Sequence, residues 1–264
     1  MKKLIKTKIF TSILVIISII IVFTPTKVGT TADVRVPIIL YHNITEDYNA
    51  SEALVNITPA EFETHIITLI ESGYNPIDFD EYYDFVTNGK VLPNKPVIIT
   101  FDDGYLSNYT YAFPILKKHN VKATIFAVTD TIGRSEGVNF AHFTWEQARE
   151  MEASGIIDIE SHSDSHANLG EMSINDVQRE FRRSKYLIEK NLNKDCNVFA
   201  FPYGGYSSEV QELGIKAGYK VLSLVGDVGA NSAGADLTAL RRITIRGTDS
   251  PEDLINTIEI NLDK

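Results

Sequence analysis

Two adjacent aspartates, Asp102 and Asp103, directly follow the apolar run VIITF and precede a glycine. Neighbouring carboxylates repel each other, and burial at the end of a strand removes water from both. An Asx turn before a helix would explain one aspartate but not a pair. A bound cation explains both, because its charge reverses the usual cost of gathering carboxylates. The pair therefore predicts a metal-assisted site in which one carboxylate binds the ion and the other takes a proton.

Two histidines, His162 and His166, lie four residues apart in the segment SHSDSH. The polar residues around them favour a loop, which can fold both rings onto one ion. Two imidazoles and one carboxylate, with a position left for water, form a common catalytic zinc set. The alternative is a pair of solvent-facing loop histidines, which is the more common origin of such a spacing. The aspartate pair favours the metal interpretation.

Short apolar runs alternate with amphipathic stretches along the chain, a pattern typical of a parallel sheet with crossover helices. The sequence predicts strands at 36–41, 96–101, 122–128, 156–161, 197–202, 219–225 and 241–245, and helices at 58–73, 107–120, 144–155, 173–192, 207–218 and 250–261. About seven such units favour a closed or nearly closed (β/α) barrel. An open doubly wound sheet is the alternative, but no glycine-rich fingerprint follows the first strand.

The carboxyl ends of the strands in such a barrel meet at one end, the mouth, where catalytic residues gather. His42 ends the first predicted strand, and Pro202, Tyr203 and Gly204 follow the strand VFAF. We expect these residues to face the same mouth as the aspartates and histidines described above.

The chain of 264 residues is 44% hydrophobic, enough for the core of one large domain. Its formal net charge of −10 gives no electrostatic basis for binding nucleic acid. Residues 1–32 combine a lysine-rich start, an apolar run and a small polar stretch, as in a secretory signal peptide or an uncleaved membrane anchor. We expect an exported domain at 33–264, without an internal disulfide because Cys196 is the only cysteine.

The motifs TFDDGYLSNY, SHSDSH and FAFPYGGYS, in this order and spacing, resemble those of the polysaccharide deacetylase family (NodB-homology domain, carbohydrate esterase family four). The resemblance spans roughly residues 36–246. It implies a deformed (β/α) barrel and the removal of N-acetyl groups from N-acetylglucosamine polymers or, less often, of O-acetyl groups from xylan. It also implies one divalent ion, usually zinc and sometimes cobalt or nickel.

The resemblance implies a role for each residue that matches a motif. Asp102 matches the general base, and Asp103, His162 and His166 match the three metal ligands. Tyr203 matches the residue whose backbone N–H helps to bind the oxyanion. The implied reaction is metal-assisted amide hydrolysis, in which a base takes a proton from water and an acid protonates the leaving amine.

Four further residues are expected to bind substrate. Pro202 and Gly204 flank Tyr203 in the third motif. Trp145 has a ring that can stack on a sugar face, and packing at the start of its helix is the alternative. Arg242, in the segment RRITI, is a candidate to supply a guanidinium that the third motif lacks.

Three departures from the common family pattern bear on the mechanism. Ala200 stands where many members carry an arginine that orients the base, the fourth motif is not visible, and no histidine follows His166 to act as a late acid. This pattern is similar to the branch that deacetylates poly-N-acetylglucosamine, whose acid comes from an early P-I-L-x-Y-H segment. The matching segment PIILYH implies that His42 is the acid, and histidine is the side-chain type whose ordinary pKa lies nearest neutrality. A packed histidine at a strand end is the alternative.

These residues predict an exported, metal-dependent N-deacetylase of a β-linked N-acetylglucosamine polymer, with poly-N-acetylglucosamine as the first candidate and peptidoglycan as the second. The alternatives are an O-acetyl-xylan esterase and a catalytically inactive carbohydrate-binding homologue. The expected partner is an acetylated extracellular polysaccharide. We expect a monomer that contacts the membrane only through residues 1–32, either secreted or anchored to the outer face of the cell membrane.

Overall fold

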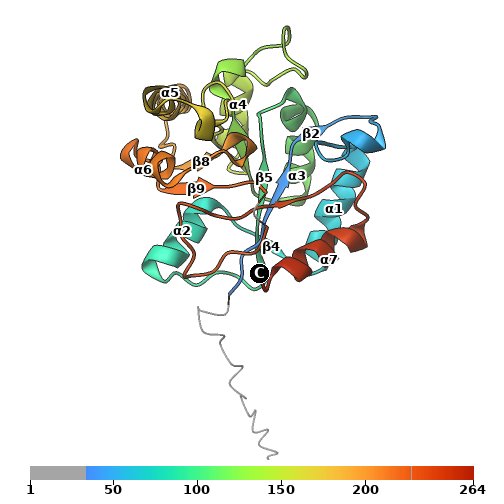
Figure 1. Ribbon diagram of the computed structural model, residues 1–264. Coiled ribbons are helices and arrows are strands. Elements are labelled where there is room, and N and C mark those ends of the chain that lie inside the picture. Colours follow the sequence, from blue (N-terminus) through green and yellow to red (C-terminus); the bar gives the residue numbers. More distant parts are fainter. Residues whose placement is uncertain (1–33, 227) are drawn as a thin grey trace, which may run out of the picture.

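The structure is a computed structural model that describes residues 34–226 and 228–264. The predicted signal or anchor segment, 1–32, lies outside the described residues. In the described part, seven parallel strands form one curled sheet in the order β10-β1-β5-β6-β7-β8-β9 (Figure 1). These strands are β1 (Ile38–Tyr41), β5 (Pro96–Phe101), β6 (Ala123–Ala127), β7 (Ile157–Ser161), β8 (Val198–Ala200), β9 (Val221–Ser223) and β10 (Ile243–Thr244).

Apart from α2, the α-helices that the structure describes cover the outer face of this sheet (Figure 1). The α-helices are α1 (Pro59–Glu71), α2 (Phe79–Asn88), α3 (Phe113–His119), α4 (Trp145–Ala153), α5 (Ile174–Leu192), α6 (Ser208–Lys216) and α7 (Pro251–Asn261), and α2 alone packs on the inner face. The remaining short strands are β2 (Asn43–Ile44), β3 (Asn56–Ile57) and β4 (Asn75–Pro76), of which β4 pairs with the start of β5. The predicted cap of α1 is confirmed, because Thr58 accepts a hydrogen bond from the Glu61 N–H in a capping box.

The two edges of the sheet approach each other through the stretch that leads into β10. The Leu222 N–H on β9 donates to the carbonyl of Leu237, and the Leu224 N–H, just after β9, donates to the carbonyl of Leu240, both over 2.8 Å. The sheet therefore curls into a half-barrel rather than opening into a doubly wound sheet. This confirms the predicted deformed (β/α) barrel with its parallel strands and crossover helices.

Helix α2 was not predicted, and it fills the inside of the half-barrel. Its aromatic residues Phe79, Tyr82 and Phe85 recur at helical spacing and pack against inward-facing strand residues such as Ile98 and Phe126. The rings of Phe79 and Phe126 lie edge to face at 5.8 Å. The acidic residues of α2 hide this apolar stripe in the sequence, because they occupy the positions between its aromatic residues.

The predicted helix 107–120 begins with a π-helical turn. Asn108–Ala112 is π-helical, and the α-helix starts only at Phe113. Pro114 explains the change, since it has no N–H to donate and its ring clashes with the carbonyl four residues earlier in a regular α-helix. Such wide turns are frequently found at functional sites.

Both ends of the described chain lie at the amino-terminal end of the half-barrel, opposite the mouth (Figure 1). Val36, just before β1, pairs with Asn231 in an antiparallel bridge, and the Arg241 guanidinium donates to the carbonyl of Lys264 over 2.9 Å. Of the helices that the structure describes, none combines the length and the apolar character needed to cross a membrane.

Candidate active site

The register of the sheet places three predicted site residues at the carboxyl ends of neighbouring strands. Strands β1 and β5 end in register, so that His42 and Asp102 follow adjacent strands, and the Asp102 N–H donates to the carbonyl of Tyr41 over 3.1 Å. His162 follows β7 in the same way, and its N–H donates to the carbonyl of Ala127 at the end of β6 over 2.9 Å. Parallel pairing thus gathers at one mouth residues that are far apart in the sequence.

Asp103, His162 and His166 form a group of potential metal ligands. One ligand atom from each lies within 4.8 Å of the others. Asp103 Oδ1 is 3.1 Å from His166 Nε2 and 3.6 Å from His162 Nε2. Asp103 and His162 are buried, whereas His166 is half-buried, so the group is open to solvent on the side of His166. Among the described residues, no other set of His, Cys, Asp and Glu meets this spacing.

The His162 ring is fixed in the tautomer that a metal ligand requires. Its Nδ1 lies 2.9 Å from the carbonyl of Ala200 and donates to it, which leaves the lone pair of Nε2 facing the carboxylates. Burial, opposed by the Asp102 and Asp103 charges, lowers the pKa of His162 to about 4. A neutral ring with a free Nε2 is the form that binds a divalent cation.

Asp102 is held by a buried arginine. Arg242 donates from Nη1 to Oδ1 over 2.6 Å and from Nη2 to Oδ2 over 2.9 Å, and both side chains are buried. Asp102 Oδ2 also lies 3.6 Å from His162 Nε2, so the carboxylate borders the group of potential ligands. A two-point contact of this kind fixes the plane of a carboxylate as well as its position.

Arg242 does not fit the substrate-binding role predicted for it, because its side chain is fully buried. Its Nε donates to the carbonyl of Leu224 over 2.8 Å, and its guanidinium lies over the Phe126 ring at 5.3 Å. It instead contacts Asp102, the predicted base, from inside the half-barrel. The other suggestion made for Arg242, that it replaces the arginine missing at Ala200, agrees with the geometry.

Both aspartates remain ionised at neutral pH. Burial raises the pKa of Asp102, but the charge and hydrogen bonds of Arg242, together with His162, outweigh it, so that the pKa falls below its ordinary value. Burial also raises the pKa of Asp103, but the hydrogen bond from His166 and the charges of nearby histidines lower it well below its ordinary value. Two adjacent carboxylates are therefore available as a base and as a ligand.

Backbone strain is concentrated at this site. Asp103, Ser163, His166 and Tyr203 have φ angles of 74°, 69°, 59° and 57°, in the left-handed region that residues with a side chain rarely adopt. Each such residue costs on the order of 1–3 kcal/mol and persists only where its surroundings enforce it. Strain of this kind clusters at functional sites.

His42 lies beside both aspartates. It is half-buried, and its carbonyl accepts a hydrogen bond from Asn108 Nδ2 over 2.8 Å. Its ring is within electrostatic reach of the Asp102 and Asp103 carboxylates. Its Nδ1 is buried and has no hydrogen-bond partner among the described residues. The half-buried ring thus lies at the strand end predicted for it, and its role as the acid stays a prediction.

The third motif forms a short turn after β8. Tyr203 is 68% exposed, and its ring lies 4.7 Å from the His166 ring, so the residue borders the proposed ligands. Pro202 is buried. Gly204 has a φ of 67°, and a Cβ at this position would lie 2.5 Å from the carbonyl oxygen of Val225. This close approach requires a glycine whether or not Gly204 also contacts substrate.

Trp145 is the first residue of α4 and is half-buried. It packs against two parts of the core, one around β5 and β6 and one around β8 and β9. This position agrees with the packing alternative for its ring.

Two residues near the site were missed in the sequence. Tyr105 makes a hydrogen bond to Asp103, and its ring lies 5.1 Å from that of His142. Asn108 donates to the carbonyl of His42, as described above. Both follow the aspartate pair within six residues. Their position just after a strand that ends at the site is the feature of the sequence that could have predicted them.

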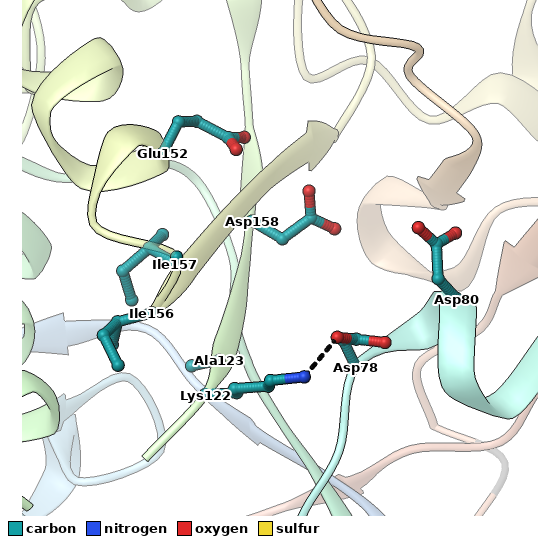
Figure 2. Close-up of a pocket in the computed structure, with 9 residues that line it drawn as sticks. Asp78, Asp80, Lys122, Ala123, Glu152, Ile156, Ile157 and Asp158 are labelled. Carbon is teal, nitrogen blue, oxygen red and sulfur yellow. Dashed lines mark hydrogen bonds and ion pairs between the residues drawn. The ribbon is translucent and has the colours of Figure 1, made fainter. Parts of the chain in front are cut away.

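A hollow of about 160 Å³ at the other end of the strands is a different feature (Figure 2). It lies beside the start of β6 and β7, and its acidic side chains are those of Asp78, Asp80, Glu152 and Asp158. Lys122 bonds to Asp78 over 2.8 Å, and Lys194 bonds to Glu152 over 3.0 Å. The carboxylates of Asp78 and Glu152 are therefore paired with lysines, and the hollow lies at the amino-terminal end of the half-barrel, away from the mouth.

Comparison with known proteins agrees with this geometry. The model of the family described as polysaccharide deacetylase matches residues 89–222. The Bacillus subtilis protein YxkH, which carries a provisional name as a polysaccharide deacetylase, is 33% identical over 222 residues, which cover 84% of this chain and 75% of that protein. The poly-beta-1,6-N-acetyl-D-glucosamine N-deacetylase of Staphylococcus epidermidis is 31% identical over 157 residues. That match covers 56% of this chain and 54% of the relative, so the chain spans about half of the length of that enzyme.

Among solved structures, the Streptococcus pyogenes deacetylase PplD in complex with acetate superposes with a TM-score of 0.77 at 29% identity, covering 85% of this chain and 98% of that one. The polysaccharide deacetylase BC0361 of Bacillus cereus has a TM-score of 0.72 at 28% identity, covering 84% and 68%. The family model and the relatives agree with the motifs in the sequence, and the solved structures agree with the fold that brings the residues of those motifs to the mouth. The chain belongs to the polysaccharide deacetylase family of enzymes.

Proposed function

We propose that the chain is an exported, metal-dependent hydrolase that removes N-acetyl groups from a β-linked N-acetylglucosamine polymer. The observation that carries the proposal is the meeting of Asp103, His162 and His166 with Asp102 and His42 at one mouth. This set contains ligands for an ion, a base and a candidate acid, which are the parts that amide hydrolysis needs.

The residues fit a divalent ion. Asp103, His162 and His166 would hold it, since two imidazole nitrogens and one carboxylate oxygen suit zinc, and cobalt and nickel accept the same donors. The fixed Nδ1–H of His162 supports this assignment, because a ligating histidine usually donates its other N–H to a nearby acceptor. The ion would polarise the acetyl carbonyl and make water more acidic.

Asp102 is the proposed general base. Its pKa lies below the ordinary value, so it is ionised and able to take a proton from the attacking water. Arg242 fixes its orientation with two hydrogen bonds. The backbone N–H of Tyr203 is the proposed oxyanion donor, with its flanking residues Pro202 and Gly204 shaping the same edge of the mouth.

Poly-N-acetylglucosamine is the first substrate to test and peptidoglycan the second. The names of relatives such as the Staphylococcus epidermidis enzyme support the first choice. The place of His42 at the mouth also supports an amide, because an amine leaving group needs a proton from an acid. We further propose that residues 1–32 direct export or anchor a monomeric domain, 33–264, outside the cell membrane.

The proposal is tested by acetate release from purified residues 33–264. We expect release from N-acetylglucosamine oligomers, first of all the β-1,6-linked polymer, and none from acetylxylan. Chelation should reduce the rate to background, and zinc or cobalt should restore it. Release from acetylxylan alone would favour the O-acetyl-xylan esterase, and no release from any acetylated glycan would favour an inactive carbohydrate-binding homologue. Full turnover after exhaustive chelation would exclude the metal mechanism.

His42→Ala should separate amide from ester hydrolysis. We expect the variant to fold and to bind metal, but to lose about 10²–10⁴-fold in rate on an N-acetylated sugar. The loss on 4-nitrophenyl acetate should be less than about tenfold, since that leaving group departs without a proton. His119→Ala is a control, because that ring pairs with Glu63 on the surface. Equal losses on both substrates would instead give His42 a positioning role, and His142 would be the next candidate acid.

A further inference from the structure

The two histidines of the proposed metal group are joined by a strained segment, the histidine loop (residues 162–166). Ser163 and His166 both have positive φ angles, of 69° and 59°. Inside the loop, the His166 N–H donates to Ser163 Oγ over 2.9 Å. The N–H groups of Asp164 and Ser165, in contrast, bond to no acceptor inside the loop. Asp164 is buried, and a buried N–H group without a partner is costly, so the loop needs an acceptor from elsewhere.

Glu180 of α5 supplies those acceptors. Its Oε2 accepts from the N–H of Asp164 over 2.9 Å and from the N–H of Ser165 over 2.8 Å. Its Oε1 accepts from the Ser165 hydroxyl over 2.8 Å. Two successive backbone N–H groups around one anion form a nest, a binding mode that proteins use for phosphate and other anions. Here the anion is a side chain of the protein itself.

The position of Glu180 shows that this contact is specific. Glu180 is 3% exposed and lies on the buried stripe of α5, whose other members are apolar or small: Val177, Phe181, Ser184 and Ile188. Burying a carboxylate is unfavourable unless hydrogen bonds compensate it. An apolar residue would pack at this position without that cost, so the carboxylate indicates a requirement in the loop that it holds.

Neighbouring positions on α5 hold the same region. Arg183, one turn further on, donates from Nε to Asp164 Oδ2 over 2.8 Å, and Asp164 Oδ1 accepts from the Thr129 hydroxyl over 2.6 Å. Ser184 accepts from the Ser161 hydroxyl over 2.8 Å, at the end of β7. Of the α5 residues named here, Glu180 alone bonds to the backbone between the two histidines. From the other side of the loop, the Thr129 N–H donates to the carbonyl of Ser163 over 3.2 Å and the Asp130 N–H donates to the carbonyl of Asp164 over 2.9 Å, so the carbonyls of the loop are held there and its N–H groups by Glu180.

We propose that Glu180 is a positioning residue that sets the affinity of the metal group, by holding the histidine loop in the conformation that directs His162 and His166 at Asp103. The proposal rests on the metal site of the proposed function. Without Glu180, the loop loses three hydrogen bonds and can relax at Ser163 and His166, which moves the His166 Nε2 away from its place 3.1 Å from Asp103 Oδ1.

The test compares Glu180→Ala, Glu180→Gln and Glu189→Ala in the full exported domain. Zinc affinity is measured by competition with a chromophoric chelator, and the visible spectrum of the Co²⁺-loaded protein reports the coordination geometry. We expect Glu180→Ala to weaken zinc binding by about 10–100-fold and to change the cobalt spectrum. Glu180→Gln should stay within a few-fold of the native protein, since its amide oxygen can accept from both N–H groups. Glu189, on the same helix, bonds to Lys185 and to the N–H of Cys196, so its variant should bind zinc normally.

A second measurement needs no metal. In the metal-free protein, hydrogen exchange at the Asp164 and Ser165 amides should become faster in Glu180→Ala and not in Glu189→Ala. If the alanine variant does not fold, Glu180→Asp keeps the charge but retracts it by one methylene, and it should weaken zinc binding in the same direction.

Native zinc affinity in a folded Glu180→Ala or Glu180→Asp variant would overturn the inference, whatever the exchange rates. Equal losses in the alanine and glutamine variants would also overturn it, because they would show a need for charge rather than for the hydrogen bonds. A native protein that binds neither zinc nor cobalt, while its Asp164 and Ser165 amides are protected by Glu180, would overturn the metal site of the proposed function instead.

Discussion

Asp102→Asn is expected to lower the rate of deacetylation by about 10²–10⁴-fold while the protein keeps its metal. The physical reason is that the amide cannot take a proton from water, whereas its oxygen can still accept one hydrogen bond from Arg242. The three proposed ligands, Asp103, His162 and His166, are untouched by this change. The measurement is the steady-state rate on an N-acetylglucosamine oligomer, together with the metal content by elemental analysis.

Asp103→Asn is the matched control, since it makes the same change, from a carboxylate to an amide, at the neighbouring residue. It should lose metal affinity first and activity as a consequence, because an amide oxygen is a weaker ligand than a carboxylate. Loss of metal in Asp102→Asn, with retention in Asp103→Asn, would mean that the two aspartates have the opposite roles. An active Asp102→Asn variant would remove the base from the mechanism altogether.

Arg242→Met is expected to destabilise the metal-free fold by about 3–5 kcal/mol, the usual cost of removing one partner of a buried ion pair. The two side chains are buried, and their contact is bidentate, so no water replaces the lost guanidinium readily. Urea unfolding measures the difference. Arg246→Met is the control, because Arg246 is exposed and its loss should change stability by less than about 0.5 kcal/mol.

The same variant should change how stability depends on pH. In the native protein the pKa of Asp102 is lowered, so its contribution is fully present above the ordinary aspartate pKa and is lost only as the pH falls through the folded value. Without Arg242 the effect of burial, which is the largest single influence on Asp102, raises the pKa instead. The variant should then lose stability as the pH rises above the ordinary aspartate pKa.

The gap between native and variant unfolding free energies should therefore widen as the pH rises above the ordinary aspartate pKa, and it should level off above the raised pKa of the variant. As the pH is lowered, the variant should lose deacetylase activity at a higher pH than the native protein does, since the base must be ionised. A gap that stays constant with pH would show that Arg242 contributes through packing on Phe126 rather than through the charge of Asp102.

The strand ends could be predicted from the sequence, and with them most of the candidate site. Apolar runs locate the strands, parallel pairing aligns their carboxyl ends, and polar residues directly after them must then share a mouth. That reasoning predicts that Asp102, Asp103, His162, His166 and His42 lie at one mouth, and in the structure they follow the carboxyl ends of strands of the same sheet.

The support of the site could not be predicted in the same way. Arg242 could be suggested as the source of the missing guanidinium only through the family resemblance, because it lies 140 residues from Asp102 and no spacing rule connects the two. Glu180 is one acidic residue on a helix rich in charge, and only its place on the apolar stripe distinguishes it. His65 reads as a surface residue, yet it is buried and bonds to the Tyr41 hydroxyl at 3.1 Å and to the carbonyl of Asp249 at 2.8 Å. Such contacts depend on how the curled sheet closes, which a one-dimensional pattern does not contain.

The position of both chain ends opposite the mouth has a practical consequence. A linker or an attachment group joined at Val34 or at Lys264 leaves from the amino-terminal end of the half-barrel (Figure 1). A domain fixed to a bead, a sensor chip or a lipid surface through either end would therefore hold its mouth outward, toward the solution. On a short linker, the mouth would face polymer chains that lie beyond the surface that carries the domain.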